Sequence, residues 1–313
     1  MDRISVVIPT YNRAALVGRA LDTALGQALP GAEILVVDDG STDDTDRVLA
    51  RYAGRVRVIH QPNRGGAAAR NRGVAEAAGD WIAFLDSDDF WPRDYLARMA
   101  AAIRATAGRA HFYFADTQLS STQGGGSLWQ RARFAIDGPH ALRDDAGAWA
   151  VLPRQPMMLQ SSLISRRALE ACGGLWERLV RRHDTHLFFK LALAGPACAV
   201  AGGGSEMTAD DTSAVRLTVG HGGKSRVYWE CTAALYADVE ARAEHAPASL
   251  RAELRRRRAF AHWRLARLAL GERRAGEGAR ELARSIGAAP LEFALRPLRS
   301  AGRALRGAAE PAA

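Results

Sequence analysis

Residues 80–96, DWIAFLDSDDFWPRDYL, place three carboxylates within four positions, directly after a short apolar run. At neutral pH Asp86, Asp88 and Asp89 repel one another unless water or a cation screens them. Oxygen ligands of this kind suit Mg²⁺ or Mn²⁺, which commonly takes one or two protein carboxylates and leaves its other positions to water and phosphate oxygens. Acidic residues in a turn are also often merely solvated. The rest of the chain must decide between a metal site and a solvated turn.

The elements around this cluster predict an α/β fold with a mostly parallel sheet flanked by helices. Strand-like apolar runs at residues 4–9, 33–38, 56–61 and 81–86 alternate with stretches of helical periodicity. In an open α/β sheet, ligands bind at the carboxyl ends of the strands. Asp38 and Asp39 follow the second run, and the Pro9–Tyr11 turn follows the first. We therefore expect three strand ends to face one crevice.

The strand pattern weakens beyond residue 115, which predicts three segments. Residues 1–115 form the first half of the α/β domain, and residues 116–226 form its second half. Residues 202–226 are rich in Gly, Ser and Thr and predict a flexible loop. Residues 227–313 are helical in composition and fade into a basic Ala, Gly and Pro tail, so we expect a C-terminal helical extension.

The net charge of +9 comes from the C-terminal part of the chain. From Leu250 onward there are 15 arginines and 6 acidic residues, whereas residues 1–249 are balanced. This excess fits either biased composition or an anionic partner, and we expect no nucleic acid. The segment LEFALRPLRSAGRALRG mixes leucines with arginines around Pro297. It is either a solvated terminus or a broken amphipathic segment that attaches to an anionic membrane surface.

Two other classes of site are disfavoured. The first strand runs into Pro-Thr-Tyr-Asn instead of G-x-G-x-x-G, so a nicotinamide enzyme is not indicated. GHGGKSR, at residues 220–226, contains Gly-Lys-Ser but has Thr218 where the first glycine of a phosphate-binding loop belongs. No basic leader and no apolar run of membrane-spanning length is visible. We expect a cytoplasmic protein, with membrane contact limited to the inner face through the tail.

Four blocks resemble the family 2 glycosyltransferases, which have the GT-A fold, and the resemblance implies an inverting enzyme that uses a divalent metal. These blocks, over about residues 3–200, are SVVIPTYNRAALVGRALDTALGQ, EILVVDDGSTDDT, NRGGAAARNRGVAEAAGDWIAFLDSDD and PMMLQSSLISRRALEACGGLWERL. The resemblance implies transfer of a sugar from a nucleoside diphosphate sugar, most often a UDP-sugar, to a hydroxyl acceptor. Synthesis of cell-surface polysaccharide or glycolipid, on an acceptor that is often lipid-linked, is the implied setting.

The resemblance also implies roles for individual residues. Pro9, Thr10 and Tyr11 would wall the base pocket of the nucleotide sugar, and Asp39 would accept the hydrogen of the base ring nitrogen. Arg70 would reach the base or the phosphates. Asp86 would contact the ribose, and Asp88 would bind the Mn²⁺ or Mg²⁺ that bridges the diphosphate.

Two further roles fall in the second half of the chain. Family members carry a Glu-Asp pair that supplies the base for the acceptor hydroxyl. Asp184 matches the aspartate of that pair, and His183 stands where the glutamate is usual. His221 is the expected third metal ligand, on a loop in which Lys224, Arg226 or Arg216 would neutralise phosphate charge.

Two other functions remain open from the sequence. A nucleotidyltransferase would also need paired aspartates for a metal, but it would want a Gly-rich basic loop after the first strand, where this chain has PTYNRAA. A basic module that binds a membrane or nucleic acid, with a non-catalytic α/β domain, rests on the tail alone.

Overall fold

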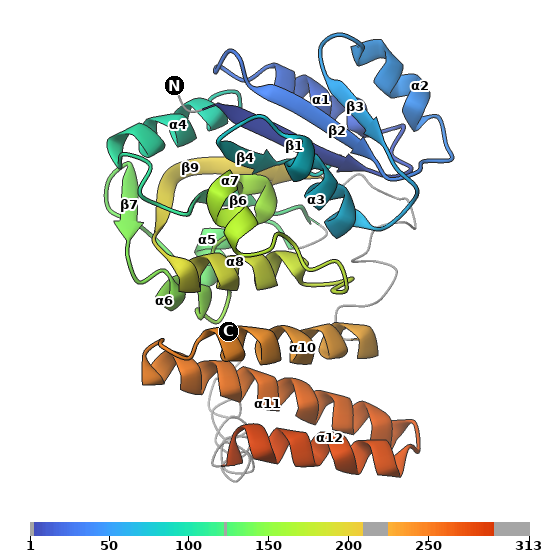
Figure 1. Ribbon diagram of the computed structural model, residues 1–313, viewed down its shortest axis with the longest axis vertical. Helices are drawn as coiled ribbons and strands as arrows, with labels where there is room; N and C mark the ends of the chain where they lie inside the picture. The colour runs from blue at the N-terminus through green and yellow to red at the C-terminus, as the bar shows by residue number, and fades with distance from the viewer. Residues whose placement is uncertain (1–2, 122–123, 209–224, 291–313) are drawn as a thin grey trace, which may run out of the picture. The chain divides into compact units, whose positions relative to one another are not determined.

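The computed structural model describes residues 3–121, 124–208 and 225–290. They fall into two compact units, one ending before residue 217 and one beginning after it, and each is described by itself. Element labels follow Figure 1.

Nine strands of the described residues form one sheet, in the order β3-β2-β1-β4-β8-β6-β9-β5 with β7 paired to β9. The strands are β1 (Ile4–Thr10), β2 (Glu33–Asp38), β3 (Arg57–His60), β4 (Trp81–Phe84), β5 (Asp89–Phe90), β6 (Phe112–Gln118), β7 (His140–Arg143), β8 (Ser162–Ser165) and β9 (Ala197–Met207). β1, β2, β3 and β4 pair in parallel, whereas β8 joins β4 and β6 in antiparallel pairs. The predicted parallel half is confirmed, and the chain reverses strand order between β1 and β4.

The helices of the first unit lie on both sides of this sheet (Figure 1). They are α1 (Val17–Leu25), α2 (Thr45–Leu49), α3 (Gly66–Glu76), α4 (Tyr95–Ala105), α5 (Leu128–Ala132), α6 (Gly147–Ala150), α7 (Arg166–Ala171) and α8 (His183–Ala194), with 3₁₀ turns η1 (Ala50–Tyr52) and η3 (Leu159–Ser161). Successive residues of a strand point to opposite faces of the sheet, so alternate residues contact different helices. Val6, Ile8 and Val36 belong to the core cluster that also holds the buried faces of α1 and α4. Val7 and Val37 point toward α3 instead.

The close approach of α3 to the sheet depends on Gly73. A Cβ atom added at this glycine would lie 2.3 Å from Cγ1 of Val7 and 3.3 Å from Cγ2 of Val37. No real side chain tolerates the first distance, so any larger residue must push α3 away from β1 and β2. α3 also carries Arg70, which makes Gly73 a determinant of where that guanidinium lies.

The segment 202–207 differs from the expectation of a loop, because it continues β9. Gly204 lies where the strand passes close to its neighbours: a Cβ there would lie 2.7 Å from Cβ of Ser161 and 3.0 Å from Cβ of Ala115. Gly202 has a positive φ of 96°. The glycines therefore reflect the close packing and the backbone conformation of a strand. The remainder of that predicted loop, residues 209–224, lies outside the described residues.

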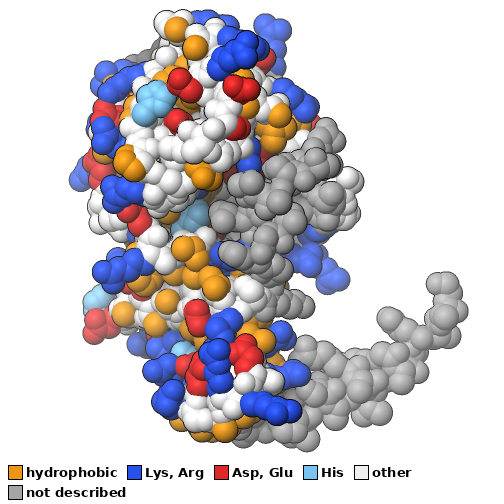
Figure 2. Space-filling view, turned by 90° about the vertical axis from the view of Figure 1, so that its right-hand side faces the viewer, with side chains coloured by type: hydrophobic (Ala, Val, Ile, Leu, Met, Phe, Trp, Pro, Cys, Tyr) orange, Lys and Arg blue, Asp and Glu red, His pale blue; other side chains and the backbone are white. Residues whose placement is uncertain are grey.

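The second unit consists of α10 (Arg226–Arg242), α11 (Ala248–Gly271) and α12 (Ala275–Ala288), which confirms the predicted helices after residue 226. Trp229 and Ala233 of α10 pack against Ala261 and Leu265 of α11. Several arginines of this unit form ion pairs with acidic residues. Arg226, for example, pairs with Glu272 and Glu277. On the face shown in Figure 2, basic and acidic side chains are interspersed. None of the described helices combines the length and the hydropathy that a membrane span requires. The tail at residues 291–313 lies outside the described residues.

Gly73→Ala should destabilise the first unit, because the added methyl group overpacks the contact between α3 and β1. We expect a loss of about 1–3 kcal/mol in the free energy of unfolding, measured by urea denaturation. Gly287→Ala is the matched control, since a Cβ at that helical position meets nothing within 4 Å. It should be neutral or stabilise by about 0.5–1 kcal/mol. Equal stability of the two variants would contradict the close packing of α3.

Candidate active site

Side-chain hydrogen bonds connect the loop after β1 to the loop after β2. The backbone N–H of Asn12 donates to Oγ of Ser41 at 2.9 Å, and the N–H of Thr42 donates to Oδ1 of Asn12 at 2.7 Å. Pro9 and Thr10 end β1, and Tyr11 follows them. Thr10 is 3% exposed, and its Oγ1 has no hydrogen-bond partner among the described residues. A buried hydroxyl of this kind is a group that a ligand or water would complete.

Asp39 follows β2 directly and holds the loop that leads into α3. Its Oδ1 accepts hydrogen bonds from Nε2 of Gln61 at 2.7 Å and from the backbone N–H of Arg64 at 2.9 Å. Its Oδ2 accepts from the backbone N–H of Gly65 at 2.8 Å, where a positive φ of 88° suits glycine. These donors were not foreseen from the sequence. Oδ2 has one recorded donor and can accept another, so the predicted contact with a base N–H stays a prediction.

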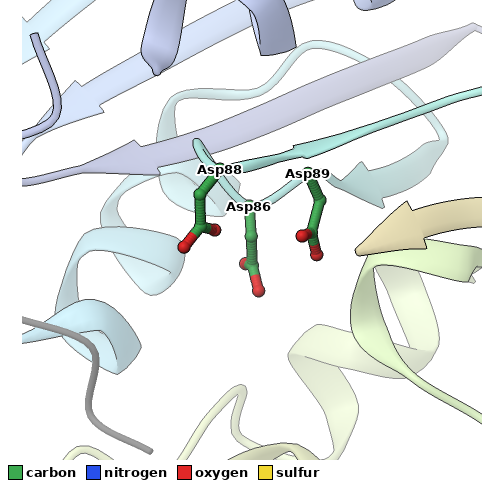
Figure 3. A group of neighbouring side chains, drawn as sticks. All are labelled: Asp86, Asp88 and Asp89. Carbon is green, nitrogen blue, oxygen red and sulfur yellow. The ribbon is translucent and has the colours of Figure 1, made fainter. Parts of the chain in front are cut away.

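Asp86, Asp88 and Asp89 lie together after β4, and one oxygen of each falls within 4.8 Å of the others. Their side chains project to the same side of the chain (Figure 3). Asp89 is buried, and its Oδ2 accepts a hydrogen bond from Nε2 of Gln160 at 3.1 Å. Three convergent carboxylates fit Mg²⁺ or Mn²⁺, both of which prefer oxygen ligands. Gln160 was missed, although it lies in one of the sequence blocks that carry the resemblance.

The guanidinium of Arg70 lies against this cluster and forms an ion pair with Asp86. The Arg70 side chain is 10% exposed and that of Asp86 is 31% exposed. Nη1 of Arg70 also donates to the carbonyl of Gly66 at 3.1 Å, while its Nε is buried without a partner in the part of the chain that the structure describes. The positive charge of Arg70 therefore offsets part of the repulsion among the three aspartates.

His183 and Asp184 begin α8, and His183 approaches the arginine that pairs with the cluster. Nε2 of His183 is 3.4 Å from Nη1 of Arg70, and Nδ1 is 3.3 Å from the carbonyl oxygen of Leu179. Oδ1 of Asp184 accepts the backbone N–H of Thr185 at 2.7 Å, as acidic residues in a first helical turn commonly do. The start of α8 thus brings His183 to Arg70 of α3. His221 lies outside the described residues.

Burial lowers the pKa of His183, and the neighbouring Arg70 guanidinium lowers it further. The Asp184 and Asp86 carboxylates act in the opposite direction on this pKa without reversing the shift. The imidazole is therefore neutral at neutral pH. The role of Asp184 as the base stays a prediction.

The geometry can be compared with known proteins. The family model described as glycosyl transferase family 2 matches residues 5–149, the part that carries β1 to β4 and the acidic cluster. Residues 5–149 form a family 2 glycosyltransferase domain. Asp184 and His183 lie outside the matched residues, so their roles are proposals.

Relatives of this family 2 domain match over similar lengths. An uncharacterized glycosyltransferase of Rickettsia felis is 45% identical over 96 residues, which is 30% of this chain and 16% of the relative. The putative glycosyltransferase EpsH of Bacillus subtilis is 37% identical over 99 residues, covering 31% of this chain and 29% of the relative. The chain thus spans less than a third of either of these two relatives.

Solved structures resemble this chain over nearly all of its length. The TarS 1–349 structure of S. aureus has a TM-score of 0.66 at 19% identity and covers 96% of this chain and 87% of that one. The mannosyltransferase PcManGT from Pyrobaculum calidifontis, in complex with GDP-Man and Mn²⁺, has a TM-score of 0.56 at 22% identity, covering 96% and 80%. At these identities the likeness shows the fold, which confirms the GT-A type α/β architecture.

His183→Gln should remove a pH dependence of stability. A histidine whose pKa is lower in the folded than in the unfolded chain favours unfolding as the pH falls, because the unfolded state then binds the proton more readily. As the pH drops from about 7.5 to about 5.5, through the unfolded pKa of about 6.5, the native chain should lose stability relative to the variant. Denaturant titrations at several pH values measure this difference. Parallel stability curves would mean that folding does not lower the proton affinity of His183.

Proposed function

We propose that this chain is an inverting, divalent-metal-dependent glycosyltransferase that moves a sugar from a nucleoside diphosphate sugar to a hydroxyl acceptor. The observation that carries the proposal is the convergence of Asp86, Asp88 and Asp89 after β4, with Arg70 paired to Asp86. The site lies where the strand order reverses between β1 and β4, the position at which open α/β sheets bind nucleotides. The family of residues 5–149 supports the same activity.

A UDP-sugar is the first donor to test. Structures of TarS 1–349 were solved with UDP and with UDP-GlcNAc, whereas PcManGT was solved with GDP-Man. We propose that Pro9, Thr10 and Tyr11 wall the base and that Asp39 accepts its ring N–H. Asp86 would contact the ribose. Arg70, which lies beside Asp86, would then face the phosphates.

We propose that Asp88 holds Mn²⁺ or Mg²⁺ together with neighbouring carboxylates of the cluster, and with His221 as a further ligand. A divalent ion bound there would stabilise the negative charge that the departing diphosphate gains. Asp184 would take the proton of the acceptor hydroxyl as its oxygen bonds to C1 of the sugar and the C1–O bond to the diphosphate breaks. The diphosphate leaves with the bonding electron pair, and a single displacement inverts the configuration at C1.

The acceptor follows from the resemblance alone. A lipid-linked glycan in polysaccharide or glycolipid synthesis is the proposed acceptor class. Attachment of the tail at residues 291–313 to the inner face of a membrane would bring the enzyme to such an acceptor, and it stays a prediction.

Asp88→Asn should abolish most nucleotide binding. Without the ion, the diphosphate would face the carboxylates of Asp86 and Asp89 unscreened. Calorimetry with UDP and Mn²⁺ should show at least about a tenfold loss of affinity for the variant, and the same loss for the native chain with a chelator. Asp144→Asn, which changes an exposed carboxylate after β7, is the control and should bind normally. Tight binding of UDP without metal would remove Asp88 from the proposed site.

Asp184→Asn should lower turnover by roughly a hundredfold or more while donor affinity is kept, because the amide cannot accept the hydroxyl proton. The amide oxygen still accepts the N–H of Thr185, so the start of α8 should be retained. Release of nucleotide from a panel of nucleotide sugars with Mn²⁺ measures turnover, and calorimetry measures affinity. A variant that turns over almost normally would exclude Asp184 as the base and leave His183 as the next candidate.

A further inference from the structure

Three side chains form a hydrogen-bonded series from the acidic cluster to α8. Asp86 pairs with Arg70, Arg70 approaches Nε2 of His183 at 3.4 Å, and Nδ1 of His183 approaches the carbonyl oxygen of Leu179 at 3.3 Å. A carbonyl oxygen only accepts, so Nδ1 carries the hydrogen. In the neutral imidazole Nε2 then has the lone pair, and it accepts the N–H of Arg70.

The surroundings of His183 favour the neutral form of its imidazole. His183 is partly buried next to Arg70, and burial together with the guanidinium lowers its pKa and so disfavours the imidazolium. His183 therefore satisfies an N–H of Arg70 without adding a negative charge. The one carboxylate recorded in an ion pair with Arg70, among the described residues, is that of Asp86.

We propose that His183 is a positioning residue that keeps the Arg70 guanidinium on Asp86 and thereby sets the net charge of the acidic cluster. A glutamate at this position, as the resemblance leads one to expect, would offer Arg70 a second carboxylate. The guanidinium would then be shared, Asp86 would be less neutralised, and the cluster would attract a divalent cation more strongly. The histidine makes this chain a weaker metal binder than a glutamate-bearing counterpart. The inference rests on the proposed function only in that the cluster binds a divalent ion.

The test compares His183→Gln with His183→Glu in the full chain. The two side chains have nearly the same shape, and both present an oxygen that can accept from Arg70, so they differ mainly in charge. Binding of Mn²⁺ alone, without nucleotide, is followed near neutral pH by the electron paramagnetic resonance of the free ion. We expect the Gln variant to match the native chain within about twofold and the Glu variant to bind Mn²⁺ about tenfold more tightly, the scale expected for one charge near a partly buried site.

A second comparison separates positioning through Arg70 from a simple effect of charge. In an Arg70→Met background the glutamate has no guanidinium to draw away, so the difference between Gln and Glu at position 183 should shrink. Thermal melts establish that each variant is folded. Should the Arg70→Met proteins not fold, the same comparison is made in an Arg70→Gln background, and an undiminished difference between Gln and Glu there would refute positioning through Arg70.

The outcomes distinguish this inference from the proposed function. If the native chain binds Mn²⁺ and the Gln and Glu variants bind it equally, the positioning role of His183 is wrong and the proposed function is untouched. The same holds if the Gln variant departs from the native chain as far as the Glu variant does, because the imidazole itself and not its charge would then matter. If none of the three proteins binds Mn²⁺, metal dependence fails and the inference fails with it.

Discussion

The ion pair between Arg70 and Asp86 is the interaction around which the rest of the site is arranged. It links α3, on one side of the sheet, to the loop after β4, and through His183 it reaches the start of α8. Removing one partner of a buried pair typically costs about 3–5 kcal/mol, because the other charge is left without compensation. Asp86 is partly exposed, so its pair falls toward the lower end of that range. The pair therefore serves both the fold and the electrostatics of the cluster.

The position of Arg70 depends in turn on how closely a helix approaches a sheet. Alternate residues of β1 and β2 face opposite sides: Val6 and Val36 join the core beneath α1 and α4, whereas Val7 and Val37 meet α3 at Gly73. The absence of a side chain at Gly73 brings the helix near enough for the guanidinium to reach the end of β4. Packing on one face of the sheet thus determines which charge meets the acidic cluster.

The sequence was sufficient for the first four strands, because each is a short apolar run followed by polar residues, and parallel strands place those residues at one edge. It also located the acidic cluster, because three carboxylates within four positions must lie close together. It could not reveal that Arg70 pairs with Asp86, since complementary charges 16 positions apart have many alternative partners. Nor could it show that Asp39 holds the loop before α3, because backbone N–H groups leave no trace in the sequence. Gly202, Gly203 and Gly204 were misread for a related reason: glycine suits a loop and also a crowded strand.

The hydrogen bonds that Asp39 accepts from the backbone would reduce the entropic cost of binding a ligand beside it. Two backbone N–H groups, those of Arg64 and Gly65, donate to its carboxylate. Fixing one backbone residue costs roughly 1–2 kcal/mol in lost conformational freedom, and here this ordering accompanies folding. If a base binds beside Asp39, as proposed, little of its interaction energy would be lost to ordering the loop. The carboxylate is in this sense a preorganising group before it recognises anything.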